Sequence, residues 1–180
     1  APLEGATRAL PWPSFVTATQ NRYAQLGTCA LPESQLDRFL MRISVGYPDR
    51  AAERLLLAGT DRRDMLAGML PILSPEALLA LQRQVQQVHA AEPLLNYLQD
   101  LIAATRSGRW FIQGLSPRAG IAVLRAARAQ ALVSGRADVP PDDIQAILPQ
   151  TVAHRLVPVG DAGRGAFEQV RAMVDAIPLP

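Results

Sequence analysis

The chain has 180 residues, of which 49% are hydrophobic, 19% charged and 5% aromatic. This length fits one ordinary domain, or one domain with a piece of another, and the hydrophobic share excludes a wholly disordered chain. All 18 basic residues are arginines, which excludes Schiff-base chemistry and a lysine-based phosphate loop within these residues. The formal net charge of +2 is only weak evidence for nucleic-acid binding.

Cys29 is the only cysteine, so the chain has no internal disulfide and no cluster of thiolate metal ligands. No apolar run approaches the ~20 residues of a membrane-spanning helix, and no leader-like segment opens the chain. We therefore expect a cytoplasmic protein with no membrane contact. The sequence around Ala1 reads as the interior of a protein, so we expect a fragment or a processed product.

The first 48 residues differ in their residue pattern from the rest of the chain. Residues 14–19 (SFVTAT) and 39–45 (FLMRISV) are apolar or β-branched runs bounded by Pro, Asn or Gly, which predicts two buried strands. A loop over residues 20–31 and a short helix over residues 32–38 are expected between them. Two strands without neighbours cannot complete a sheet, so we expect exposed apolar surface and self-association or a loosely ordered amino-terminal part.

From Asp49 onward the pattern is helical. Asp49 and Ser74 are typical capping residues, and they predict helices over residues 50–58 and from Pro75. Further helical segments are predicted over residues 93–105, 116–134, 139–148, 150–156 and 167–177. The turn at residues 46–49 (GYPD) marks the boundary. The predicted fold is mainly α, a helical bundle over residues 49–180 preceded by a partial α/β unit over residues 1–48.

The sequence lacks the residue motifs of common enzyme active sites. His89 and His154 have no Cys, Asp or second His at metal-ligand spacing, which favours hydrogen-bonded or exposed helix histidines. No serine lies in a nucleophile elbow, and Cys29 has no histidine within local reach. The sequence also contains no G-x-x-x-x-G-K-[ST] loop and no apolar strand that ends in paired acids for Mg²⁺.

Two polar residues flank the predicted strands. Asn21 follows the run at residues 14–19, and ligands of α/β proteins bind beyond the carboxyl ends of strands. The Asn21 side-chain amide could bind a water or a phosphate oxygen. Arg38 lies at the end of a short predicted helix, which would hold its guanidinium in a fixed position. The alternative is a turn asparagine and a salt-bridging surface arginine, and spacing alone favours that alternative.

Several ordered motifs resemble the MoxR-type AAA+ ATPases. Residues 18–21 (ATQN) and 27–39 (GTCALPESQLDRF) resemble the family patterns A-T-Q-N-P and G-T-x-x-L-P-E-A-Q-L-D-R-F. Residues 116–118 (SPR), 139–143 (VPPDD) and 152–156 (VAHRL) resemble the lid segments S-P-R, V-T-P-D-D and V-x-A-H-R-L. The matches keep their order across nearly the whole chain.

This resemblance implies that residues 1–48 end a P-loop ATPase core and that residues 49–180 form the helical AAA+ lid. Asn21 matches the sensor-1 asparagine, which orients water near the γ-phosphate. Arg38 matches the arginine finger, which reaches the nucleotide of the neighbouring subunit. Arg118 matches the sensor-2 arginine of the lid, and its place in a first helical turn disfavours it for the helix itself.

The sequence departs from the family patterns at a few places. Arg22 stands where the family has proline after the sensor-1 asparagine, and Ser34 stands where alanine is commoner. The larger departure is the absence of the Walker A and Walker B segments, which precede this part in the family. Without them we expect this chain alone neither to bind ATP tightly nor to hydrolyse it.

The resemblance further implies what the intact protein does. It would use ATP and Mg²⁺, assemble as a ring, expected to be a hexamer, and act like a chaperone that matures or assembles partner complexes. Its partners would often be von Willebrand A-type proteins, and it would bind no nucleic acid. Two alternatives stay open: a stand-alone helical interaction module without ATPase activity, and a basic helical nucleic-acid binder, which steep salt dependence of DNA binding would reveal.

Overall fold

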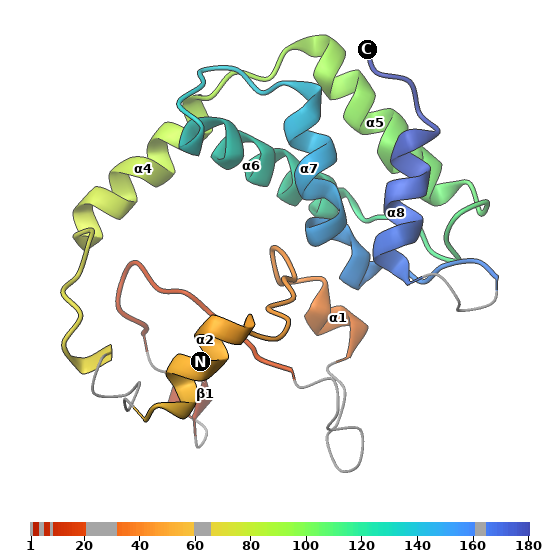
Figure 1. The fold of residues 1–180 in the computed structure, drawn as a ribbon. Helices are drawn as coiled ribbons and strands as arrows, with labels where there is room; N and C mark the ends of the chain where they lie inside the picture. The colour runs from red at the N-terminus through yellow and green to blue at the C-terminus, as the bar shows by residue number, and fades with distance from the viewer. Residues whose placement is uncertain (1, 4–5, 8, 21–31, 60–65, 161–164) are drawn as a thin grey trace. The chain divides into compact units, whose positions relative to one another are not determined.

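The computed structural model describes residues 2–3, 6–7, 9–20, 32–59, 66–160 and 165–180 (Figure 1). The chain divides into two compact units, one made of Ala1–Thr17 and Ser44–Leu81 and the other of Ala18–Ile43 and Gln82–Pro180. The buried hydrophobic side chains of the described residues all belong to the second unit. The domain boundary expected between residues 48 and 49 stays a prediction.

Strands are short in the part of the chain that the structure describes. β1 (Pro2–Leu3) and β2 (Ala6–Thr7) pair in antiparallel register within the first unit. The strands predicted over residues 14–19 and 39–45 are wrong, because neither segment forms a ladder. A strand exists only where a neighbouring strand bonds its N–H and C=O groups, and no described strand pairs with either run.

The exposure expected of these two runs is confirmed. Phe15 is 75% exposed, Ile43 is 71% exposed and Val45 is 90% exposed. Aliphatic and aromatic side chains of this size are normally buried. The two runs therefore have the composition of buried strands, although they form no sheet in the described residues. Self-association of the chain through this surface stays a prediction.

Two helices begin in the first unit at the predicted caps. α2 (Arg50–Leu57) starts after Asp49, whose carboxylate accepts a hydrogen bond from the Ala52 amide at 2.7 Å. α4 (Pro75–Gln87) starts after Ser74, whose hydroxyl accepts from the Ala77 amide at 3.2 Å. Neither helix buries a residue, so local capping rather than packing explains where they start.

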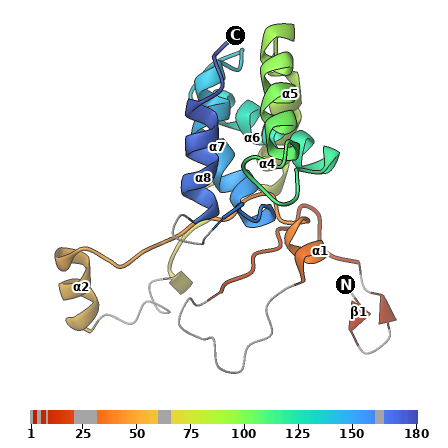
Figure 2. The same ribbon diagram turned by 90° about the vertical axis from the view of Figure 1, so that its right-hand side faces the viewer.

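In the second unit, four helices form a bundle around one core (Figure 1, Figure 2). They are α5 (Glu92–Arg106), α6 (Pro117–Val133), α7 (Pro141–Val152) and α8 (Ala166–Asp175). α7 packs against both α6 and α8, and α5 contacts the other three helices. The helices predicted over residues 93–105, 116–134, 139–148 and 167–177 are therefore confirmed, apart from shifts at their ends.

Small residues on α6 explain its close packing. Ala119, Ala127 and Ala131 are fully buried, and a side chain at Gly120 would meet Ile102 of α5. The inward face predicted for α7 is also confirmed, because Ile144, Ile147 and Leu148 are all buried. Short side chains on one helix and branched ones on the next let the two backbones approach closely.

The segment predicted as a separate helix over residues 150–156 is a continuation of α7. α7 runs to Val152, and the chain then forms one 3₁₀ turn, η1 (Ala153–Arg155). This turn carries His154 and Arg155 at the end of the bundle. Among the described helices, none is both long and apolar enough to cross a membrane.

The buried hydroxyl of Thr105 fixes the loop that leads into α6. It donates to the Ile102 carbonyl at 2.6 Å and accepts from the Leu115 amide at 3.1 Å. The Arg106 guanidinium donates to the Leu115 carbonyl through Nε at 3.0 Å and Nη2 at 2.8 Å. Both polar groups of the Leu115 backbone are therefore held by the end of α5.

We expect Thr105→Val to destabilise the chain by about 1–3 kcal/mol, because the Leu115 amide would be buried without an acceptor. Thr105→Ser keeps the hydroxyl and loses only a methyl group, so it is the matched control and should cost about 0.8 kcal/mol. Urea unfolding followed by circular dichroism measures both values. A valine variant as stable as the serine variant would contradict this account of the loop.

Candidate functional site

Two of the three predicted site residues lie in the described part of the chain. Asn21 falls outside the described residues. Arg38 follows α1 (Glu33–Leu36), and Arg118 lies in the first turn of α6. Both arginine side chains are exposed to solvent.

The start of α6 holds Arg118 firmly. The Ser116 hydroxyl accepts from the Ala119 amide at 3.2 Å, and Pro117 occupies the first helical position. The preceding residue, Leu115, is the one anchored by α5. Arg118 therefore projects from a fixed helix start, where the free N–H groups of the first turn also favour an anion.

Arg38 lies on a tight turn that continues α1. The Arg38 amide donates to the Gln35 carbonyl at 3.1 Å, and the Phe39 amide donates to the Leu36 carbonyl at 3.1 Å. The backbone on both sides of Arg38 is thus fixed, while its side chain extends into solvent. Such a mount lets the guanidinium reach a group outside this chain.

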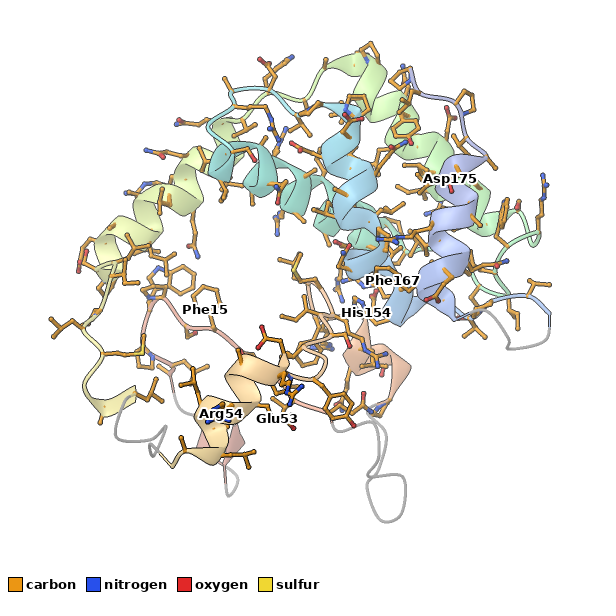
Figure 3. The ribbon with its side chains drawn as sticks, in the orientation of Figure 1. Phe15, Glu53, Arg54, His154, Phe167 and Asp175 are labelled. Atoms are coloured by element: carbon orange, nitrogen blue, oxygen red, sulfur yellow. The ribbon has the colours of Figure 1, made fainter. Side chains whose placement is uncertain are left out.

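η1 holds this turn through a single backbone carbonyl. Arg155 Nη2 donates to the Phe39 carbonyl at 2.6 Å, and His154 Nε2 lies 3.2 Å from the same oxygen. Figure 3 shows His154 at the end of the bundle, beside the segment that carries α1. Because a carbonyl only accepts, this contact is a hydrogen bond in the tautomer that carries its proton on Nε2.

Arg155 also faces Asp37, on the other side of Arg38. Its Nε lies 3.5 Å from the Asp37 carboxylate, an ion pair too long to count as a hydrogen bond. The Arg155 side chain is only 5% exposed. One buried guanidinium therefore contacts the residues immediately before and after Arg38.

The same end of the bundle leaves some polar atoms without partners. Arg155 Nε and Nη1 and His154 Nδ1 are buried and make no hydrogen bond within the described residues. Burying charged donors in this way is costly, so Arg155 depends strongly on the two partners it has. A further backbone bond joins the segments, since the Arg42 amide donates to the Gln150 carbonyl at 2.8 Å.

The electrostatics follow from this burial. Burial lowers the pKa of Arg155, the Asp37 carboxylate opposes that shift, and the positive charge of Arg118 adds to it. Burial also lowers the pKa of His154, with Arg155 and then Arg42 adding to the effect, against the Phe39 carbonyl and Asp37.

The structure brings the turn of Arg38 against η1, and the charge of Arg118 acts on the Arg155 side chain that holds this turn. Sequence reasoning missed Arg155 and Asp37 as members of this site. Both lie inside the motifs at residues 152–156 and 31–39, which was the available signal. Sequence spacing could not show that the two motifs meet, because the hydrogen-bonded residues Phe39 and Arg155 are 116 positions apart.

This arrangement suits phosphate groups better than it suits a metal ion. Exposed guanidiniums on rigid mounts match the geometry and charge of phosphate oxygens. The described residues contain no group of three or more His, Cys, Asp or Glu side chains that could hold a metal ion.

Comparisons with known proteins give the family. Residues 2–41 match the model of the ATPase family associated with various cellular activities (AAA), and residues 103–177 match that of the AAA lid domain. The chain is 37% identical to Chaperone MoxR1 of Mycobacterium tuberculosis, over 88% of this chain and 44% of that protein. It is 34% identical to Protein MoxR of Paracoccus denitrificans, over 92% and 56% respectively. The chain belongs to the MoxR-type AAA+ family.

Two further proteins are similar to most of this chain. The uncharacterized protein YeaC of Bacillus subtilis is 37% identical over 99% of this chain and 57% of its own length. The solved structure of a candidate ATPase from Cytophaga hutchinsonii has a TM-score of 0.75 at 27% identity, over 89% of this chain and 52% of that one. The chain spans about half the length of these relatives. The expected MoxR resemblance and the mainly α fold of an AAA+ lid are therefore confirmed.

We expect His154 to make stability depend on pH. Its pKa lies below the ordinary value of 6.5 in the folded chain, so the unfolded chain binds the proton first as pH falls. The stability that neutral His154 contributes is present above pH ~6.5 and is lost as pH falls toward the folded pKa. His154→Gln keeps a donor for the Phe39 carbonyl but does not titrate.

Urea unfolding of both proteins between pH 7.5 and 5.5 provides the measurement. The wild-type chain should lose more unfolding free energy than His154→Gln over this range. Parallel curves would show that His154 does not experience the burial described here.

Proposed function

We propose that this chain is the carboxyl-terminal part of a ring-forming MoxR-type AAA+ ATPase. Residues 1–48 would end its ATPase core, and residues 49–180 would form its lid. The observation that carries the proposal is that Arg155 contacts the residues on both sides of Arg38, while the positive charge of Arg118 acts on the same Arg155 side chain. Two exposed guanidiniums on rigid mounts suit the charge that develops during phosphoryl transfer.

Each predicted residue has a separate role in this proposal. Asn21 orients the attacking water near the γ-phosphate. Arg118 binds the nucleotide of its own subunit, and Arg38 reaches the nucleotide of the neighbouring subunit. An arginine supplied in this way contributes about 10³–10⁵ to the rate, mainly by stabilising transition-state charge.

ATP and Mg²⁺ complete the proposed site. When bound, Mg²⁺ neutralises charge on the phosphate oxygens, and its ligands and the phosphate cradle belong to Walker segments that this sequence does not contain. The residues of this chain would supply positive charge and orient the reacting groups, but they would not form the phosphate cradle. This division explains why we expect the chain alone to lack ATPase activity.

The biological role that we propose is chaperone-like. The intact ring, which we take to be a hexamer, would couple ATP hydrolysis to maturing or assembling partner complexes in the cytoplasm, often with von Willebrand A-type partners. The support is the name of a relative, Chaperone MoxR1. No nucleic acid or membrane enters this role.

We expect Arg38→Ala in the full-length protein to lower kcat by roughly 10³-fold or more with little change in KM, because the arginine acts on transition-state charge. Arg118→Ala should raise KM as well as lower kcat, because it also contacts the bound nucleotide. Arg83→Ala removes an exposed arginine of α4 and is the control. Steady-state ATP hydrolysis measures all three, and wild-type kinetics in Arg38→Ala would contradict the proposal.

The 180-residue chain alone should bind Mg–ATP too weakly to detect at micromolar concentrations. Isothermal titration calorimetry on the purified chain provides the measurement. The reason is the missing phosphate cradle, since single arginines in water hold an anion weakly. Micromolar affinity would show that these residues form a nucleotide site on their own.

A further inference from the structure

We propose that Arg155 and His154 act as positioning residues that hold Arg38 in place for the neighbouring subunit, an inference that rests on the proposed function. Their contacts with Asp37 and the Phe39 carbonyl are called the η1 clamp below. The clamp holds the residue before Arg38 and the residue after it, and it leaves the Arg38 side chain free.

An arginine suits this task better than other side chains. Its planar guanidinium presents several donors in fixed directions, so one group can face a carbonyl and a carboxylate at once. Arg155 does so with a 2.6 Å bond to the Phe39 carbonyl and a 3.5 Å contact with Asp37. Because its side chain is 5% exposed, water competes little for either partner.

The clamp reaches Arg38 through a short and stiff path. Arg38 and Phe39 both bond back to α1, so the turn cannot rotate independently of the clamped carbonyl. A second tether follows where the Arg42 amide bonds to the Gln150 carbonyl of α7. The segment that carries Arg38 is thus attached to the bundle at two points, the Phe39 carbonyl and the Arg42 amide.

Such attachment matters because arginine catalysis is sensitive to position. A misplacement of about 1 Å in a catalytic group can cost roughly 100-fold in rate. A turn held only by its own backbone bonds would leave Arg38 free to shift by that amount. The clamp makes the lid of each subunit responsible for the position of the arginine that it offers to its neighbour.

The first test asks whether the clamp exists and does not involve ATP. Amide hydrogen exchange of Arg42 should be about tenfold faster or more in Arg155→Gln than in the wild-type 180-residue chain, because loss of the charged bond frees the turn. Arg83→Gln on α4 is the matched control and should leave this exchange unchanged. Equal exchange in Arg155→Gln and wild type would overturn the clamp.

The second test asks whether the clamp positions Arg38. In the full-length protein, Arg155→Gln should lower kcat roughly 10- to 100-fold with KM nearly unchanged. Arg155→Lys keeps the charge without the planar fork, so it should recover part of the rate. A normal kcat beside faster exchange would overturn the positioning role, as would a KM effect without a kcat effect.

Mixed rings separate positioning from a general loss of structure. Arg155→Gln subunits keep their own nucleotide site, whereas subunits with an inactivated Walker A segment keep a positioned Arg38. Mixing these two impaired proteins should raise the activity above the sum of the two alone, because each Arg155→Gln site can then receive Arg38 from an intact neighbour. No recovery would overturn the inference, since a misfolded subunit or an effect on its own site gives that result.

These outcomes are distinct from failure of the proposed function. If the wild-type full-length protein hydrolyses no ATP, the ATPase proposal fails, and the positioning role fails with it. The exchange experiment on the 180-residue chain still decides whether the η1 clamp joins the two segments. If the wild type is active and only the Arg155 experiments fail, the ATPase proposal stands and the clamp does not.

Discussion

The contact between the Arg155 guanidinium and the Phe39 carbonyl is the constraint on which the candidate site depends. A guanidinium that is 5% exposed must find acceptors, because a buried cation without partners is strongly destabilising. The chain supplies them from residues 37 and 39, which lie on either side of the exposed Arg38. Burial of one arginine thereby fixes the backbone of another that stays free.

The same bundle positions Arg118 through a different set of hydrogen bonds. The end of α5 holds both polar groups of the Leu115 backbone, and Ser116 then caps α6 one residue before its first turn. Since α6 also packs closely on α7, both arginine mounts are attached to one set of packed helices. An exposed cation on a rigid mount loses little entropy when an anion arrives, which is the physical advantage of preorganisation.

Local signals in the sequence predicted most of the helices. Asp49, Ser74 and Ser116 cap helices as their side chains and the following residues indicate, since a cap depends on three or four consecutive residues. The runs at residues 14–19 and 39–45 failed as strands because strand formation depends on partners elsewhere. Arg155 was missed for a related reason, because no local pattern joins it to Phe39. Motif resemblance gave the family, and only the folded chain gave this contact.

An experimental structure of the full-length protein with a nonhydrolysable ATP analogue and Mg²⁺ tests the central claim most directly. The distance between the Arg155 guanidinium and the Phe39 carbonyl is the quantity to measure. The account predicts a hydrogen bond there, with Arg38 directed to the nucleotide of the adjacent subunit. A separated pair, with Arg38 still at that nucleotide, would show that the arginine is positioned by other means.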